Sequence, residues 1–309
     1  MIEVLLATYN GQAFLTEQMN SLLAQEGAEL RVLARDDGSL DGTVEILERY
    51  ARDFPERVSI LHSPGRLGGQ GSFSWLLGQA QASYVAFCDQ DDVWASNKLR
   101  SLFERMQRLE SELGKDTPLL VHSDLAVVDR NLQPIHTSFW SYSGINPARQ
   151  ELAQILVKNT VTGCALLANR ALIEKARPIP DEAAMHDHWL ALVATVFGHI
   201  EEIHEPLVVY RQHANNAVGA QAYGWHNILK RFLSSCGRMD ITRLRRQAGA
   251  FYTRFAKQLS PEQGALIDGF AHLPGRGWFG RRIFLLHHGI LMPGLIRNLA
   301  LLFCVRLGK

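Results

Sequence analysis

Three aspartates stand within four residues after a strongly apolar segment. The run Asp89-Gln90-Asp91-Asp92 follows residues 84–88, which have the composition of a buried strand. Carboxylates this close repel one another, so the arrangement is stable mainly when a cation lies among them. Oxygen ligands suit Mg²⁺ or Mn²⁺, and either ion can bridge to a diphosphate. The alternative is a solvated acidic turn before a helix that starts near Asn97, and the position after a buried-type strand favours the metal site.

Polar residues also follow the first two predicted strands. Thr8-Tyr9-Asn10 comes after the first, and Asp36-Asp37-Gly38-Ser39 comes after the second. A carboxylate in the second segment can accept the imino N–H of a uracil or thymine ring, while glycine permits close approach. The same residue types are favoured in a turn that leads into a helix N-cap. Taken alone, this segment favours the turn.

Two later segments contain a candidate general base and candidate diphosphate-binding side chains. In His186-Asp187-His188-Trp189, the carboxylate is either a charge at a helix N-terminus or a general base for an acceptor hydroxyl. In Tyr210-Arg211-Gln212-His213, the Arg and His side chains can hold a diphosphate, His213 by coordination and Arg211 by charge-assisted hydrogen bonds. A loop histidine hydrated by water is the alternative at His213.

The elements that must position these residues alternate between strand and helix. Such alternation predicts βαβ units and a parallel sheet covered by helices on both faces, with ligands at the carboxyl ends of the strands. The chain contains no GxGxxG after the first strand and no GxxxxGK[ST], which excludes the usual dinucleotide-binding turn and the P-loop. The expected strands are 2–7, 30–34, 58–62, 84–88 and 206–210, with an apolar run at 161–168, and the expected helices are 14–25, 43–54, 72–82 and 189–197.

Composition limits the setting. Of 309 residues, 47% are hydrophobic and 20% are charged, which is typical of a globular protein and excludes a disordered one. The four cysteines show no CxxC spacing, and the first residues lack the pattern of a secretory signal, so we expect a reducing, cytoplasmic location and neither a zinc site nor a disulfide scaffold. No run of 18 apolar residues occurs, so a membrane-spanning helix is not expected.

The last 89 residues are strongly basic. Residues 221–309 carry a net charge of +11, which leaves −10 for residues 1–220, and helical periodicity dominates from about residue 220. Basic helices with interleaved apolar residues favour an anionic membrane surface. Packing on the acidic half and a homo-oligomer interface are the alternatives, whereas no nucleic-acid-binding motif accompanies the charge. We therefore expect a catalytic domain over 1–220 and a basic helical region over 221–309.

These segments, in this order, resemble glycosyltransferase family 2, especially bacterial O-antigen and capsule enzymes of the rhamnosyltransferase kind. The resemblance covers about residues 1–218. One departure is Arg66-Leu67-Gly68, where relatives often carry Asn before the glycine. The matching segments are Ala7-Thr8-Tyr9-Asn10-Gly11, Asp36-Asp37-Gly38-Ser39, Phe87-Cys88-Asp89-Gln90-Asp91-Asp92-Val93-Trp94, Thr162-Gly163-Cys164, His186-Asp187-His188-Trp189-Leu190 and Tyr210-Arg211-Gln212-His213.

The resemblance implies an α/β fold of the GT-A type, in which a Rossmann-like nucleotide-binding half and an acceptor-binding half share one sheet. It implies a metal-dependent, inverting glycosyltransferase with Asp187 as the base and a Mg²⁺ or Mn²⁺ ion held by Asp89, Asp91 and His213. The implied donor is a nucleoside diphosphate sugar, with TDP-rhamnose first, and the acceptor is a lipid-linked glycan at the inner face of the cytoplasmic membrane. The expected donor-binding residues are Thr8, Tyr9, Asn10, Asp37, Arg66, Asp89 and Arg211, and the expected acceptor-side residues are Thr162, Gly163, Cys164, His186 and Trp189.

Two other functions fit part of the pattern. A nucleotide-sugar pyrophosphorylase shares the α/β front and the metal, but it normally opens with a glycine-rich loop that contains Arg or Lys, unlike Thr8-Tyr9-Asn10-Gly11. A non-catalytic scaffold for glycan assembly does not need the carboxylates that this chain retains. Release of pyrophosphate identifies the first, and absence of nucleoside diphosphate release identifies the second.

Overall fold

The computed structural model describes residues 1–63, 65–213, 239–292, 294–303 and 305–306. The chain forms two compact units. The first comprises Met1–Phe139, Val161–Pro178 and Phe197–Ala220, and the second comprises Trp140–Thr160, Ile179–Val196 and Gln221–Lys309. The first part of the helical periodicity expected from about residue 220, up to residue 238, lies outside the described residues, and the division at residue 220 stays a prediction.

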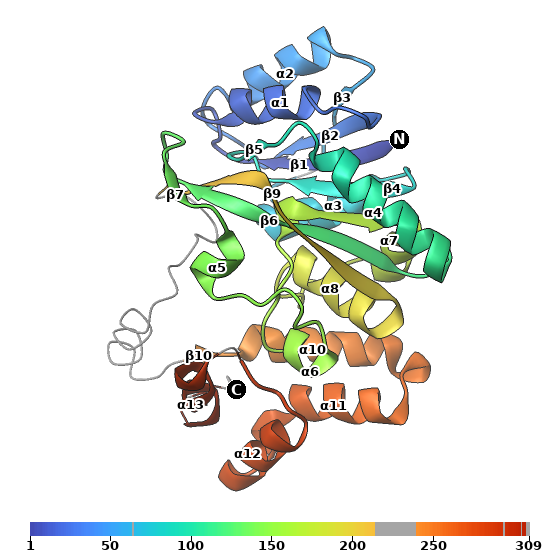
Figure 1. Cartoon of the computed structure of the whole chain (residues 1–309), viewed down its shortest axis with the longest axis vertical. Coiled ribbons are helices and arrows are strands. Elements are labelled where there is room, and N and C mark those ends of the chain that lie inside the picture. The colour runs from blue at the N-terminus through green and yellow to red at the C-terminus, as the bar shows by residue number, and fades with distance from the viewer. Residues whose placement is uncertain (64, 214–238, 293, 304, 307–309) are drawn as a thin grey trace. The chain divides into compact units, whose positions relative to one another are not determined.

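A single mixed sheet runs through the first unit (Figure 1). Among the described residues it has nine strands in the order β3-β2-β1-β4-β8-β6-β9-β5, with β7 paired to β6. Strands β1 to β4 run parallel to one another, and β6 runs parallel to β9, whereas β8, β5 and β7 run antiparallel to the strands with which they pair. The strands are β1 Ile2–Thr8, β2 Leu30–Asp36, β3 Val58–Ile60, β4 Tyr84–Cys88, β5 Val93–Trp94, β6 Leu119–Val128, β7 Pro134–His136, β8 Leu166–Asn169 and β9 His199–Arg211.

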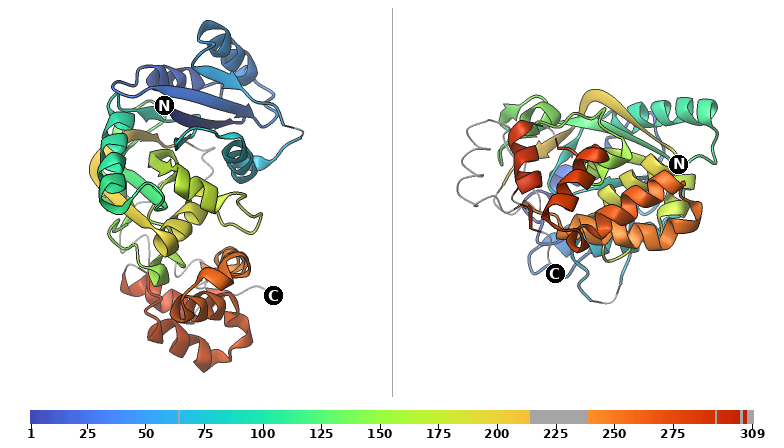
Figure 2. Two further views of the ribbon diagram at one scale, coloured as in Figure 1. Left: turned by 90° about the vertical axis from the view of Figure 1, so that its right-hand side faces the viewer. Right: turned by 90° about the horizontal axis from the view of Figure 1, so that it is seen from below.

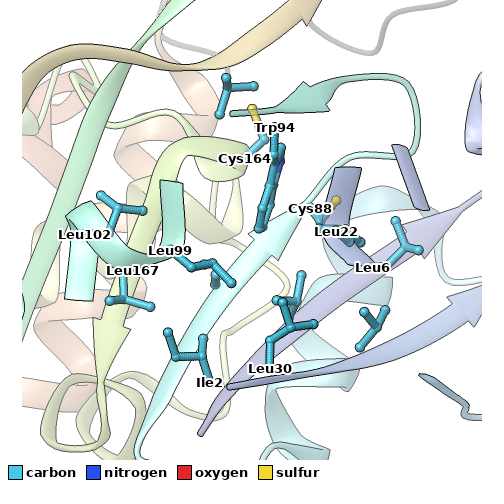
Figure 3. Close-up of a cluster of buried hydrophobic side chains, with 14 of the residues drawn as sticks. Ile2, Leu6, Leu22, Leu30, Cys88, Trp94, Leu99, Leu102, Cys164 and Leu167 are labelled. Atoms are coloured by element: carbon cyan, nitrogen blue, oxygen red, sulfur yellow. The ribbon is translucent and has the colours of Figure 1, made fainter. Parts of the chain in front are cut away.

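Helices cover both faces of this sheet, as the alternating pattern predicts. Apolar residues of α1, α2 and α4 pack with Val4 and Leu6 of β1 in one buried cluster, part of which Figure 3 shows. On the opposite face, Phe73 of α3 meets Phe87 of β4 edge to face, with ring centroids 5.7 Å apart. The helices of this unit are α1 Leu15–Leu23, α2 Thr43–Asp53, α3 Gly68–Gln79, α4 Lys98–Leu113 and α7 Arg170–Ala176, with a 3₁₀ turn η1 at Gly163–Ala165.

The second unit is mainly helical in its described residues. Its core joins residues far apart in sequence: Trp189 is fully buried and meets Phe251 edge to face at 5.4 Å. Ser260 starts α11 with a reciprocal capping box to Gln263, and a proline follows the cap. The helices are α5 Phe139–Ser143, which begins at the last residue of the first unit, α6 Leu152–Ile155, α8 His186–Phe197, α10 Thr242–Phe255, α11 Pro261–Ala271, α12 Trp278–His287 and α13 Leu295–Phe303.

Short elements complete this unit. Two 3₁₀ turns, η2 Ala256–Gln258 and η3 Leu273–Gly275, join the helices, and β10 Met239–Asp240 pairs in parallel with β11 Val305–Arg306. Figure 2 shows α10 to α13, coloured orange to red, gathered into one cluster. None of the helices in the described ranges is both long and apolar enough to cross a membrane. The expected helical C-terminal region is therefore present.

Candidate functional site

The predicted chemistry-bearing loops meet at one edge of the sheet. Because β1, β2, β4, β6 and β9 run in the same direction, their carboxyl ends lie along that edge. The loops after β1, β2 and β4 carry Thr8–Asn10, Asp37–Ser39 and Asp89–Asp92, and Gln212 and His213 follow β9.

The loops after β1 and β2 are joined by side-chain hydrogen bonds. The Thr8 hydroxyl donates to Asp36 Oδ1 at 2.9 Å, and the backbone N–H of Asn10 donates to Ser39 Oγ at 2.8 Å. The other oxygen of Asp36 accepts the N–H groups of Gly38 and Ser39. Helix α2 begins with Gly42 as N-cap and has no side-chain cap. Asp36 therefore joins the loops after β1 and β2, and no side chain of this segment caps α2.

Asp37 is buried and ionised beside Arg35. The carboxylate accepts a hydrogen bond from Arg35 Nη1 at 2.8 Å and from the N–H groups of Leu67 and Gly68 at 2.6 and 2.9 Å. Burial on its own raises the pKa of Asp37, but these hydrogen bonds and the Arg35 charge outweigh it and lower the pKa. Sequence reasoning missed Arg35, whose place inside β2 gives no signal of an ion pair.

Tyr9 and Arg66, both predicted to bind donor, lie against each other. The Arg66 guanidinium lies over the Tyr9 ring, 4.2 Å from its centroid, and both side chains are exposed. Gly38 has a φ of +84°, and a Cβ at this position would come within 3.4 Å of Arg66. The three residues lie together on the exposed surface beside Asp37.

Gln90 joins the loop after β1 to the loop after β4, residues Asp89–Asp92, which is called the acidic loop below. Its Oε1 accepts the Tyr9 N–H at 2.8 Å, and its Nε2 donates to the Tyr9 carbonyl at 2.9 Å. A Cβ on Gly11 would lie 2.1 Å from this Oε1, so any other residue at position 11 would displace the Gln90 side chain. Sequence reasoning did not assign Gln90 a role, although its place between two predicted metal ligands is a signal.

The acidic loop is built into the protein and is not a solvated turn. Asp92 is fully buried, and its Oδ1 accepts the Arg211 N–H at 3.1 Å. Ligand atoms of Asp89, Asp92 and Cys164 all lie within 4.8 Å of one another. Burial, and then the charges of Asp91 and Asp89, raise the pKa of Asp92 well above its usual value.

Asp91 and His213, two of the three predicted metal ligands, are in direct contact. His213 Nε2 lies 2.8 Å from Asp91 Oδ2, and the His213 ring stacks on Phe14 with centroids 4.7 Å apart. The histidine side chain is 10% exposed, which excludes the freely hydrated loop histidine. The contact with Asp91 and the stacking on Phe14 together hold the imidazole at the acidic loop.

Arg211 is buried and engaged by the protein. Its guanidinium donates to the carboxylate of Glu17 in α1, to the Asp91 carbonyl at 2.9 Å and to the Arg130 carbonyl at 2.8 Å. It also lies over the Phe14 ring, 4.8 Å from the centroid. This side chain therefore positions the acidic loop, and its predicted contact with a diphosphate stays a prediction.

A buried lysine lies below the acidic loop. Lys98 donates to the Cys164 carbonyl and lies over the Trp94 ring, 2.9 Å from its centroid. Burial lowers the pKa of Lys98 to about 7. Of the predicted acceptor-side segment, Gly163 and Cys164 are buried in η1 and Thr162 is half-buried beside them. Cys164 thus lies beside the carboxylates, and an acceptor-side role for the three residues stays a prediction.

The predicted base belongs to the second unit. Asp187 is half-buried in the first turn of α8, where its Oδ1 accepts the His188 N–H at 2.6 Å. This contact is compatible with both the helix N-terminal charge and the base. His186 is buried and Trp189 lies in the core, so either would act on an acceptor only through the position of α8.

Comparison with known proteins supports the resemblance. The family model for "Glycosyl transferase family 2" matches residues 3–174, more than half of the chain. The dTDP-rhamnosyl transferase RfbG of Shigella flexneri is 25% identical over 222 residues, covering 70% of this chain and 74% of that protein. The putative teichuronic acid biosynthesis glycosyltransferase TuaG of Bacillus subtilis is 31% identical over 229 residues, covering 72% and 83%.

A similar fold occurs in a solved structure. S. aureus TarS 1-349 in complex with UDP-GlcNAc aligns with a TM-score of 0.56 and 14% identity, covering 97% of this chain and 89% of that one. At this identity the likeness concerns the fold alone. It agrees with the GT-A fold expected from the sequence.

Proposed function

Because the chain belongs to glycosyl transferase family 2, we propose that it moves a sugar from a nucleoside diphosphate to an acceptor hydroxyl with inversion at the anomeric carbon. The observation that carries the proposal is the meeting of the acidic loop after β4 with His213, beside the loops that follow β1 and β2. dTDP-rhamnose is the first choice of donor, because a relative bears the name dTDP-rhamnosyl transferase. UDP-hexoses follow, because the similar TarS structure contains UDP-GlcNAc.

The donor set fits a hard divalent cation. Asp89 and Asp91 supply carboxylate oxygens, His213 supplies an imidazole, and the buried carboxyl of Asp92 lies next to Asp89. Burial raises the pKa of the Cys164 thiol, which keeps it protonated and makes it a poor ligand. We assign the ion to Asp89, Asp91 and His213. When bound, Mg²⁺ or Mn²⁺ neutralises charge on the departing diphosphate.

The residues of the chain supply the remaining steps. Asp187 accepts the proton of the acceptor hydroxyl, whose oxygen attacks the anomeric carbon from the face opposite the diphosphate. The new C–O bond forms as the bond to the diphosphate oxygen breaks, and the nucleoside diphosphate departs. Thr8, Tyr9, Asn10, Asp37 and Arg66 hold the nucleoside end, with the ionised Asp37 able to accept the imino N–H of the base.

The acceptor proposed is a lipid-linked surface glycan. Support comes from the teichuronic acid biosynthesis named for one relative and from the +11 net charge of residues 221–309. A basic region of this kind favours peripheral binding at the anionic inner face of a membrane, where such acceptors are found.

The experiment measures nucleoside diphosphate release from dTDP-rhamnose and UDP-hexoses with Mg²⁺ or Mn²⁺. Release by wild type should stop with EDTA. The folded Asp91→Asn variant, without EDTA, should release no more than wild type does with EDTA, because the variant lacks one carboxylate ligand. Asp116→Asn is the matched control: this exposed aspartate precedes β6, at the opposite edge of the sheet from the acidic loop.

Equal release with and without EDTA, in wild type and Asp91→Asn alike, would contradict the metal site. Pyrophosphate release from a nucleoside triphosphate would instead identify a pyrophosphorylase. Absence of any release with the full donor panel and glycan acceptors would favour the scaffold.

A further inference from the structure

Helix α12 has an inner face that packs and an outer face that does not. Phe284 and Leu285 are buried, whereas Trp278, Phe279, Ile283 and Leu286 are 52%, 74%, 66% and 56% exposed. Phe279, Ile283 and Leu286 follow the spacing i, i+4, i+7, which places them on one side of the helix. The four exposed residues are called the outer face of α12 below.

Positive charge lies at this outer face in Arg282 and predominates in the surrounding sequence. The Arg282 guanidinium lies over the Trp278 ring, 3.4 Å from its centroid, so a cation stands among the exposed apolar side chains. Residues 276–309 contain no Asp or Glu. Their basic residues are Arg276, Arg281, Arg282, Arg297, Arg306 and Lys309.

We propose that the outer face of α12 binds an anionic lipid surface, with Phe279, Ile283 and Leu286 in the apolar layer and Arg282 among the headgroups. Aromatic rings with a polar handle and arginines with apolar stems are suited to this boundary. The inference rests on the proposed lipid-linked acceptor for its purpose, since docking brings the enzyme to the surface that holds the acceptor.

A second copy of the chain is the competing occupant, and charge argues against it. In a two-fold symmetric contact, the outer face meets its own copy, which brings Arg282 against a surface with the same positive charge. A membrane with anionic headgroups supplies the opposite charge, and each basic residue near it adds to binding that falls as salt rises.

The experiment is co-sedimentation of the full chain with phosphatidylcholine vesicles, with and without phosphatidylglycerol, at low and high salt. Wild type should pellet with the anionic vesicles and be released by salt. Phe279→Ser/Ile283→Ser should weaken this binding about tenfold or more, because two apolar anchors are lost. Leu113→Ser/Ile135→Ser is the matched control, since both residues are 46% exposed and lie in the first unit.

Failure of wild type to pellet with anionic vesicles overturns the proposal, as does unchanged pelleting of Phe279→Ser/Ile283→Ser. A self-associated wild type that this variant makes monomeric, with no vesicle binding, assigns the face to a second copy instead. Nucleoside diphosphate release with the full donor panel and glycan acceptors separates the two proposals: vesicle binding without any such release by wild type leaves the docking surface standing and contradicts the transferase. Equal urea unfolding midpoints for variant and wild type show that the variant is folded.

Discussion

Burial shifts the pKa values of Asp92, in the acidic loop, and of Lys98, in α4, in opposite directions. Burial raises the pKa of Asp92 and lowers the pKa of Lys98 to about 7. Each shift favours the neutral form of the side chain. A cation at Asp89 and Asp91 adds positive charge that favours ionised Asp92. The ionisation of the buried Asp92 therefore depends on whether a cation is bound at Asp89 and Asp91.

Asp187→Asn tests the proposed base. The Asn side chain keeps an oxygen that can accept the His188 N–H, so α8 should still start at the same place. The amide cannot take up a proton, and we expect turnover to fall by about two to four orders of magnitude, the usual contribution of a general base. Steady-state kinetics give turnover, and donor titration should give an unchanged dissociation constant.

Glu182→Gln is the matched control for this variant. It removes an exposed carboxylate of the same unit, five residues before Asp187, and should leave turnover unchanged. Near-normal turnover in Asp187→Asn would leave only the helix N-terminal charge as its role.

Sequence patterns located the loops better than they assigned the individual side chains. Tyr9 with Arg66 and Asp91 with His213 are pairs of predicted residues that the fold brings into contact. Arg211 points into the protein, because Glu17 in α1 and two carbonyls surround it, and no local pattern reports a partner 194 residues away. A strand-end motif indicates where polar side chains gather, but long-range partners decide where each one points.

Helix α8 carries two imidazoles that the fold keeps neutral. Burial lowers the pKa of His186 to about 3 and that of His188 to about 4, from a usual 6.5. His188 Nε2 lies 2.6 Å from the Ile155 carbonyl, which can only accept, so the neutral ring carries its proton on Nε2. Between pH 6.5 and about 4 the unfolded chain binds protons at these positions and the folded chain does not. The free energy of unfolding therefore falls as pH falls through this window.

His188→Gln tests this linkage. Its amide can still donate to Ile155 but cannot titrate, so the variant should lose less stability on acidification. Between pH 7 and pH 5 we expect the wild-type free energy of unfolding to fall by about 2 kcal/mol more than that of the variant. Urea unfolding at the two pH values measures the difference. An identical pH dependence in both proteins would show that His188 is not the titrating group.

Element boundaries show where local patterns stop being sufficient. The expected helix at 72–82 begins four residues earlier, at Gly68, because Asp37 accepts the N–H groups of Leu67 and Gly68 from another loop. Glycines at 68, 69 and 71 argue against a helix when the segment is considered alone. The expected strand at 206–210 is the end of the 13-residue β9, whose polar first half pairs with β6. Tertiary partners supply both extensions.

At the scale of the whole molecule, the residues proposed to bind the donor all belong to the first unit. Hydrogen bonds join their loops across the sheet edge, through Thr8 to Asp36, Gln90 to Tyr9 and Arg211 to the acidic loop. A ligand that binds these loops stabilises the folded chain, since the loops exist together only in that state. At a hundred times its dissociation constant, such a ligand adds about 2.7 kcal/mol.

Thermal unfolding with nucleotides should therefore identify the base end of the donor. With Mn²⁺, dTDP should raise the wild-type unfolding temperature by roughly 5 °C at saturation and by more than UDP does. Arg66→Ala removes the cation over Tyr9 and should reduce the rise by half or more. Arg49→Ala is matched, because Arg49 lies over the Tyr50 ring at 5.2 Å on α2, and it should keep the full rise. Equal rises in both variants would exclude Arg66 from the nucleotide site, and a larger rise with UDP would replace dTDP-rhamnose as the first choice of donor.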